Sequence, residues 1–218
     1  MTAIFDSISE PLSRRVTAGL AKIGLVLRSR AWKGAGSAGV TPTQGQALAL
    51  LREAPQGMKL AALAHLLGVS APTASEAVAA LVAKQLAEKA AGADRRSLTL
   101  KLTAQGEAVA LRTADWPDFL VDAVETLDPQ EQAGFLRALV KIIRALQENG
   151  DIPVQRMCVT CRHFRPYAHP GSPTPHHCAF VDAPFADRHL RLNCPEQDQA
   201  PAEQRDEAWA RFTAPAGA

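Results

Sequence analysis

Apolar residues recur at helical spacing along most of the first 150 residues of the chain. They fall three or four positions apart in residues 5–29, and residues 34–37 (Gly-Ala-Gly-Ser) follow, which predicts one long helix that ends before a loop. Thr41 and Gln44 have the spacing of a capping box, with a proline at the first helical position between them. A second helix is therefore expected from Thr41 to about Glu53.

Two short helices are predicted next. Residues 60–67 carry a helical apolar pattern that stops at Gly68, a residue suited to a left-handed helix cap. Ser70 is the expected N-cap of the following helix, whose inward face consists of Ala74, Val78 and Leu81. The opposite face of this fourth helix is polar or small, with Pro72, Thr73, Ser75, Glu76 and Ala79.

The period of the pattern then changes from helical to alternating. Residues 98–102 alternate leucine with polar side chains, as a half-buried strand does, and residues 86–90 are its expected hairpin partner. The tip between them, residues 91–96, contains a glycine, an aspartate and two adjacent arginines, which is typical of a turn. Thr103 is the expected cap of a long helix that Pro117 breaks or kinks.

A last helix is predicted to begin at Asp128, which forms a second capping box with Glu131, and to end at residues 149–150. Two short helices joined by a glycine-containing turn and followed by a basic hairpin are the pattern of a winged helix-turn-helix. The expected fold is therefore mainly α-helical with a small β-hairpin wing.

Two motifs in this region resemble the MarR family of bacterial regulators. The first is Leu66-Leu67-Gly68-Val69-Ser70, at the entry of the fourth helix. The second is Asp94-Arg95-Arg96 followed by Leu100-Lys101-Leu102-Thr103, which meets the family's wing signature of Asp-x-Arg and Leu-x-Leu-Thr. The resemblance covers residues 5–149 and leaves the rest of the chain outside it.

The resemblance implies a homodimer that binds double-stranded DNA, with the first and last helices in the dimer interface. It implies that the fourth helix enters the major groove and that the wing residue Arg96, supported by Asp94, enters the minor groove. By position, the residues of the fourth helix that face DNA are Ser70, Thr73, Ser75 and Glu76. This helix has no arginine, so the positive charge is expected to come from Lys59, Arg95 and Arg96.

The same resemblance suggests a small-molecule effector. Trp32, Trp116 and Phe119 are candidates for bordering an effector pocket, and the alternative is that these aromatic residues belong to the core. His65, beside an apolar face, is expected to be a packed residue rather than a ligand.

Composition places the chain among globular proteins. The 218 residues are 47% hydrophobic and 21% charged, and the net charge of +2 is too small to argue for nucleic acid by itself. The sequence has no apolar run of the roughly 20 residues that cross a bilayer and no signal-peptide pattern at its start, so no membrane association and a cytoplasmic location are expected.

The composition changes abruptly near residue 150. All four cysteines, five of the six histidines and nine of the fifteen prolines lie beyond it, which predicts a DNA-binding and dimerisation domain in residues 1–150 and a separate extension in residues 151–218. The extension has few large apolar side chains, so we expect it to be irregular and to need a metal staple for order.

The cysteines are the expected ligands of that staple. Cys158 and Cys161 form a Cys-x-x-Cys pair, and Cys178 and Cys194 follow after sixteen and fifteen residues. This spacing, with Phe164, Phe180 and Phe185 as an apolar shell, resembles high-potential iron–sulfur proteins more than a zinc ribbon with two Cys-x-x-Cys pairs. The expected cofactor is an iron–sulfur cluster, with zinc as the alternative and with His176 or His177 as a substitute for one cysteine.

Three functions stay open at this point. The first is a DNA-binding transcription regulator, not an enzyme, that senses redox state or iron through a four-cysteine metal site. The second is the same regulator with a purely structural zinc clip. The third is a thiol or iron–sulfur redox or electron-transfer protein that uses the winged helix for protein contacts, and it requires an exposed thiol of low pKa.

Overall fold

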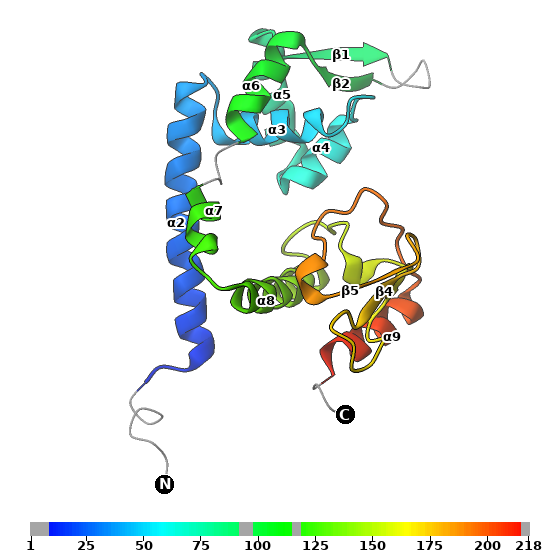
Figure 1. The fold of residues 1–218 in the computed structure, drawn as a ribbon. Helices are drawn as coiled ribbons and strands as arrows, with labels where there is room; N and C mark the ends of the chain where they lie inside the picture. The colour runs from blue at the N-terminus through cyan, green and yellow to red at the C-terminus, as the bar shows by residue number, and fades with distance from the viewer. Residues whose placement is uncertain (1–8, 92–97, 115–118, 215–218) are drawn as a thin grey trace. The chain divides into compact units, whose positions relative to one another are not determined.

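The structure of the chain is a computed structural model, and it describes residues 9–91, 98–114 and 119–214. Packing divides the chain into two compact units, Met1–Asp122 and Ala123–Ala218. In the described residues each unit is mainly helical or irregular and carries a small antiparallel sheet (Figure 1). The functional boundary expected near residue 150 stays a prediction, because packing groups the last long helix with the extension.

The first unit contains a bundle of short helices from which a hairpin projects (Figure 1). Its described elements are α2 (Leu12–Ser37), α3 (Pro42–Arg52), α4 (Leu60–Leu67), α5 (Ala71–Ala83), β1 (Ala87–Ala91), β2 (Leu98–Leu102) and α6 (Ala104–Ala114). The predicted capping box between Thr41 and Gln44 is present at the start of α3. Apolar side chains from these elements form one core, which includes Leu48, Leu51, Leu63, Val78, Leu81, Leu86 and Leu100.

Helix α2 is longer at its C-terminal end than the sequence predicted. Residues 34–37, expected to be a loop, form its last turn. Ala35 is fully buried in the core of the first unit, and its carbonyl oxygen accepts a 2.9 Å hydrogen bond from the N–H of Val40. Gly39, with a φ of 70°, ends the helix instead. Burial of Ala35 therefore outweighs the weak helix propensity of the neighbouring glycines.

The hairpin has the predicted partners with a small shift. β1 pairs with β2 in an antiparallel register in which Ala87 lies opposite Leu102. Met58 adds a bridge that the alternation did not predict: its N–H donates to the carbonyl of Leu100 at 3.0 Å, and its own carbonyl accepts from the Leu100 N–H at 2.8 Å. Leu100 is buried, but Leu98 is 64% exposed, so the expected half-buried alternation is wrong at Leu98.

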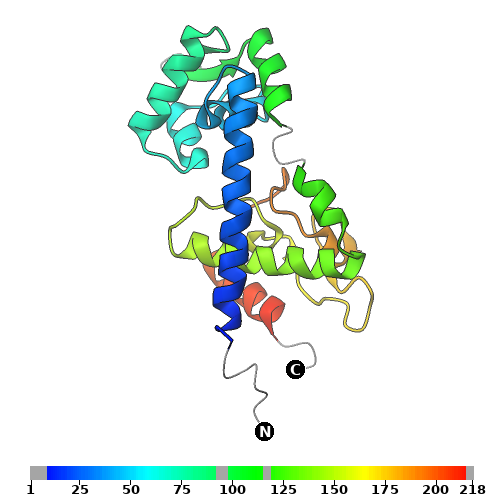
Figure 2. The same ribbon diagram turned by 90° about the vertical axis from the view of Figure 1, so that its left-hand side faces the viewer.

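The second unit joins a long helix to the extension. The boundary between the units falls within α7 (Phe119–Glu125), and the long helix of the second unit is α8 (Pro129–Glu148), which begins with the predicted capping box of Asp128 and Glu131. The extension then forms η1 (Cys158–Thr160), β3 (Phe164–Arg165), β4 (His176–Cys178), β5 (Ala183–Phe185), η2 (Asp187–His189) and α9 (Ala202–Thr213). The three strands form one antiparallel sheet in the order β3-β4-β5. Figure 2 shows α8 from the side, with α9 in red below it.

The extension is more regular than expected, because it shares a core with α8. Val140 of α8 is 1% exposed and packs in one apolar cluster with side chains of the extension: Met157, Val159, Phe164, Leu190 and Phe212. The extension itself has few large apolar side chains. It takes part in a core nevertheless, because α8 supplies part of the apolar surface.

Among the described residues, no single helix is long and apolar enough to cross a membrane, although α4 and α5 meet the length and composition test as a pair bent by 110°.

We predict that Gly106→Ala lowers the stability of the first unit. A Cβ atom on Gly106 would overlap the carbonyl oxygen of Leu86, so α6 could not keep its close approach to the start of the hairpin. Overpacking of this kind costs about 1–3 kcal/mol. Gly36→Ala is the matched control, because a Cβ there meets nothing within 4 Å. Differential scanning calorimetry should give a lower melting temperature for the first variant only, and equal values would contradict this packing.

Candidate functional site

The angle between α4 and α5 is set by the turn between them. The two helices are bent by 110° with respect to each other, within the range of DNA-binding helix pairs. Gly68 ends α4 in the left-handed conformation, with φ 65° and ψ 31°, as the sequence predicted. Ser70 caps α5 by accepting a 3.3 Å hydrogen bond from the N–H of Thr73, and the two hydroxyl oxygens lie 2.8 Å apart.

Helix α5 presents a polar face to solvent. It buries Ala74, Ala77, Val78 and Leu81, which include all three predicted inward positions. The predicted DNA-facing residues of this helix are all exposed: Ser70, Thr73, Ser75 and Glu76. Lys59, the N-cap residue of α4, is exposed as well.

The positive charge of this face is sparse in the described residues. Lys84, at the C-terminal end of α5, donates hydrogen bonds to the carbonyl of Gly39 at 2.7 Å and to Gln44 Oε1 at 3.0 Å, so it has a structural role. Sequence reasoning missed Lys89, an exposed residue of β1. Its position on the strand that leads to the wing could have indicated a contact with DNA. The predicted wing residues lie outside the described residues: Asp94, Arg95 and Arg96.

The candidate effector residues are only partly described. Trp32 is 59% exposed. The ring of Phe119 is covered by the guanidinium of Arg30, which lies 5.4 Å from the ring centre. Trp116 lies outside the described residues. An effector pocket stays a prediction. His65 is exposed, so the expectation that it packs is wrong.

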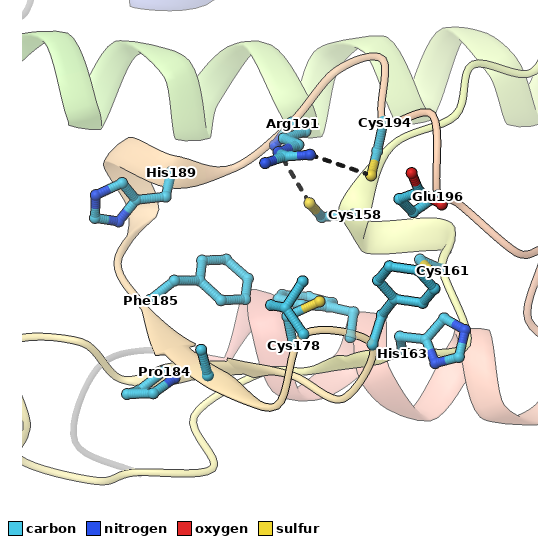
Figure 3. Close-up of a pocket in the computed structure, with 14 residues that line it drawn as sticks. Cys158, Cys161, His163, Cys178, Pro184, Phe185, His189, Arg191, Cys194 and Glu196 are labelled. Carbon is cyan, nitrogen blue, oxygen red and sulfur yellow. Dashed lines mark hydrogen bonds between the residues drawn. The ribbon is translucent and has the colours of Figure 1, made fainter.

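All four cysteines line one cavity in the second unit. Cys158 is the first residue of η1 and Cys161 directly follows it, Cys178 ends β4, and Cys194 lies in the loop after η2. They are free, half-buried thiols around a cavity of about 160 Å³. Figure 3 shows Arg191, Cys158 and Cys194 along one side of it and Cys178 across from them. Among the described residues, no three His, Cys, Asp or Glu side chains form a group that could hold a single metal ion.

Arg191 is a functional candidate that sequence reasoning missed. Its backbone N–H donates to the Sγ of Cys158 at 3.3 Å, and its guanidinium Nη1 lies 3.8 Å from the Sγ of Cys194. Burial raises the pKa of the Cys158 thiol to about 11, although the hydrogen bond from Arg191 acts in the opposite direction. Such a thiol is a weak nucleophile at neutral pH, which disfavours a thiol-exchange function for Cys158.

His176 and His177 have other partners. The Nδ1 of His176, a fully buried side chain, accepts a 3.3 Å hydrogen bond from the N–H of Tyr167, so its proton is on Nε2, which donates to Asp187 at 2.9 Å. Both nitrogens of His176 are therefore engaged. His177 bridges His169 and Asp182 at 3.2 and 3.1 Å. Neither histidine lines the cavity, so the suggested substitution for a cysteine ligand is wrong.

Asp187 links the sheet of the second unit to α8. One carboxylate oxygen accepts from His176, and the other accepts from Arg137 of α8 at 3.1 Å. Burial by itself would raise the pKa of Asp187, but the hydrogen bond from His176 and the charge of Arg137 hold that pKa below its usual value. The carboxylate is thus charged at neutral pH, as the contact with Arg137 requires.

A second arginine of α8 holds η1 and α9. The side chain of Arg144 is 3% exposed and forms ion pairs with Glu148 at 2.7 Å and Asp206 at 3.6 Å. It also donates to the carbonyl of Val159 at 3.4 Å, and its guanidinium lies 4.2 Å from the ring centre of Trp209. The cysteine pocket is therefore attached to α8 by directional contacts as well as by the shared core.

Comparisons with known proteins agree with this architecture. The sequence model of the MarR family matches residues 38–97, which contain the helix-turn-helix and part of the hairpin. Among curated proteins, no sequence matches the chain.

Three solved structures illustrate the likeness. Rv1404 from Mycobacterium tuberculosis is 26% identical over 63% of this chain and 96% of its own, with a TM-score of 0.50. The MarR family transcription regulator SP03579 is 20% identical over 67% of this chain and 97% of its own, with a TM-score of 0.57. MepR of S. aureus in its DNA complex is 22% identical over 59% of this chain and 94% of its own, with a TM-score of 0.54. The fold is thus mainly helical with small antiparallel sheets, of the winged-helix MarR type.

Proposed function

We propose that this chain is a DNA-binding transcription regulator of the MarR type and acts as a homodimer on double-stranded DNA. The observation that carries the proposal is the exposed polar face of α5, held at 110° to α4 and followed by the β1–β2 hairpin. A helix fits the major groove, and a hairpin beside it reaches the neighbouring backbone or minor groove. The solved MepR–DNA complex, which has a similar fold, supports this use of the fold.

The residues of α5 determine how such a protein would read DNA. Thr73 and Ser75 offer hydroxyl groups that donate to or accept from either kind of base edge, and Glu76 accepts a hydrogen bond from cytosine. Lys84 is held in internal contacts, so α5 offers little positive charge. Phosphate binding then depends on four cationic side chains: Lys59, Lys89, Arg95 and Arg96. The second subunit doubles the number of these contacts.

The dimer proposal is based on α2. Leu12, Val16 and Ile23 follow one another at spacings of four and seven positions, so they lie on one face of the helix, and they are 67%, 48% and 40% exposed. Most of the other residues between positions 12 and 30 of this helix are exposed as well. A helix with such an exposed apolar stripe needs a partner surface, and the family resemblance gives its role as dimerisation.

We predict that Arg96→Ala weakens binding to all DNA sequences and lowers the salt slope by about 1, because one cationic contact with DNA is lost. The matched control is Arg112→Ala, which removes an exposed arginine of α6 that belongs to neither the helix-turn-helix nor the hairpin. Fluorescence anisotropy with a labelled duplex at several salt concentrations measures both quantities. An Arg96→Ala protein with unchanged affinity and slope contradicts the proposal.

We predict that the wild-type protein is a dimer at micromolar concentration and that Val16→Glu with Ile23→Glu shifts it toward monomer. In a dimer, the two new charges on the apolar stripe of α2 would lose their contact with water, and this cost in free energy weakens the association. Multi-angle light scattering gives the mass, and Arg112→Ala again serves as the control. A monomeric wild-type protein would remove the two-fold mode of DNA binding.

We also propose that the state of the cysteine pocket regulates DNA binding through α8. This helix holds η1 through Arg144 and Asp187 through Arg137, and it corresponds to the last helix of the family pattern, which the resemblance assigns to the dimer interface. A change at the pocket can therefore reach the helix that the resemblance assigns to the dimer interface, and DNA binding by a dimer depends on that interface.

We predict that Cys194→Ser changes DNA affinity by about fivefold or more, the scale of a coupling of 1 kcal/mol. The measurement is the same anisotropy titration, done without oxygen and with His169→Ala as the control for a substitution in the extension. Equal affinities of the Cys194→Ser and wild-type proteins contradict regulation by the pocket and leave DNA binding itself in place.

A further inference from the structure

We propose that the four-cysteine pocket binds an iron–sulfur cluster through Cys158, Cys161, Cys178 and Cys194. The proposal concerns the second unit alone, so it stands whether or not the chain binds DNA.

The shape of the site is the first argument. The thiols come from three separate segments of the extension and surround a cavity of about 160 Å³. A zinc ion with bonds of about 2.3 Å requires four sulfur atoms that converge on one point. A cluster is a body of several atoms, and it holds its four thiolates apart. Thiols spaced around a cavity therefore fit a cluster better than a single ion.

The surroundings of the thiols are the second argument. Besides the cysteines, the cavity is lined mainly by apolar side chains: Phe164, Phe180, Val181, Ala183, Pro184 and Phe185. Phe164 is 3% exposed and packs against Phe185, with ring centres 5.9 Å apart. Phe180 and Val181, which are 52% and 64% exposed, form the open side of this shell, and its buried side limits the access of water, which controls the stability and the potential of a metal centre.

Hydrogen bonds to sulfur are the third argument. Arg191 directs its backbone N–H to Cys158 Sγ and its guanidinium to Cys194 Sγ, at 3.3 and 3.8 Å (Figure 3). Donors of this kind stabilise the negative charge of thiolate ligands and tune the reduction potential of a cluster. A cationic side chain among thiols is also a favourable counterion for four thiolates.

The attachment of the pocket is the fourth argument. Val159, between the two cysteines of the Cys-x-x-Cys pair, is 2% exposed in the core shared with α8. On the other side, His176 of β4 is held by Asp187, and Cys178 ends the same strand. Both sides of the cavity are therefore held by contacts with the rest of the second unit, and Cys158 and Cys161 themselves pack against the shared core, which preorganises the ligand set.

The test is reconstitution of the full chain with ferrous iron and sulfide in the absence of oxygen. The wild-type protein is expected to turn brown and to retain iron and acid-labile sulfide in equal amounts. Each single Cys→Ser variant is expected to retain at least about tenfold less iron, since a ligand is lost. His169→Ala, a change in the extension outside the cavity, should retain as much iron as the wild type.

Arg191→Gln provides a readout that does not depend on loss of the cluster. The variant keeps the backbone N–H that contacts Cys158, so it is expected to bind the cluster with a lower reduction potential, because it lacks the charge beside Cys194. A redox titration followed by electron paramagnetic resonance measures the potential. A colourless wild-type protein after reconstitution, one zinc per chain in place of iron, or wild-type iron content in the Cys→Ser variants would each overturn the proposal.

Discussion

The packing of Val140 on α8 against Met157 and Phe212 is the interaction on which the second unit depends. These three side chains are at most 1% exposed, and they join the long helix to the beginning and the end of the extension. An extension with so few large apolar residues could not offset the entropy of ordering its backbone by itself. Arg137 and Arg144, seven residues apart on α8, add directional contacts to the same surface.

This dependence changes how the cysteine pocket is understood. The sequence suggested an extension that a metal must hold together. In the structure, the segments that carry the thiols also take part in the core with α8, in the buried His176–Asp187 pair and in the short sheet. A bound group would therefore lie among segments that also contact α8, so a change at the group can alter the surroundings of this helix. Such a response is what a regulatory site requires.

The winged-helix unit presents a different balance of forces. Its core depends on leucines spaced along short helices, and its exposed α5 face is polar and nearly uncharged. Lys84 holds the end of α5 against Gly39 and Gln44, so the fold uses the one lysine of that segment internally. Recognition by such a helix depends on hydroxyl groups and shape, while charge comes from neighbouring elements and from the second subunit.

The sequence by itself determined the features that depend on local chemistry. Capping at Thr41, Ser70 and Asp128, the left-handed cap at Gly68 and the inward face of α5 all depend on residues within one or two helical turns of each other. The co-occurrence of four cysteines in one segment likewise predicted a shared site before their common cavity was known. Local hydrogen bonds and helical periodicity are readable from the residues alone.

Tertiary structure decided whatever depends on contacts distant in the sequence. Burial of Ala35 in the core keeps residues 34–37 helical, and the bridge from Met58 to Leu100 joins segments about 40 positions apart. The hydrogen bond to Asp187 occupies Nε2 of His176. The position of Arg191 beside two sulfur atoms is set by the folded loop that carries it. Long-range packing selects among local preferences that differ by less than about 1 kcal/mol per residue, so no local pattern could have given these results.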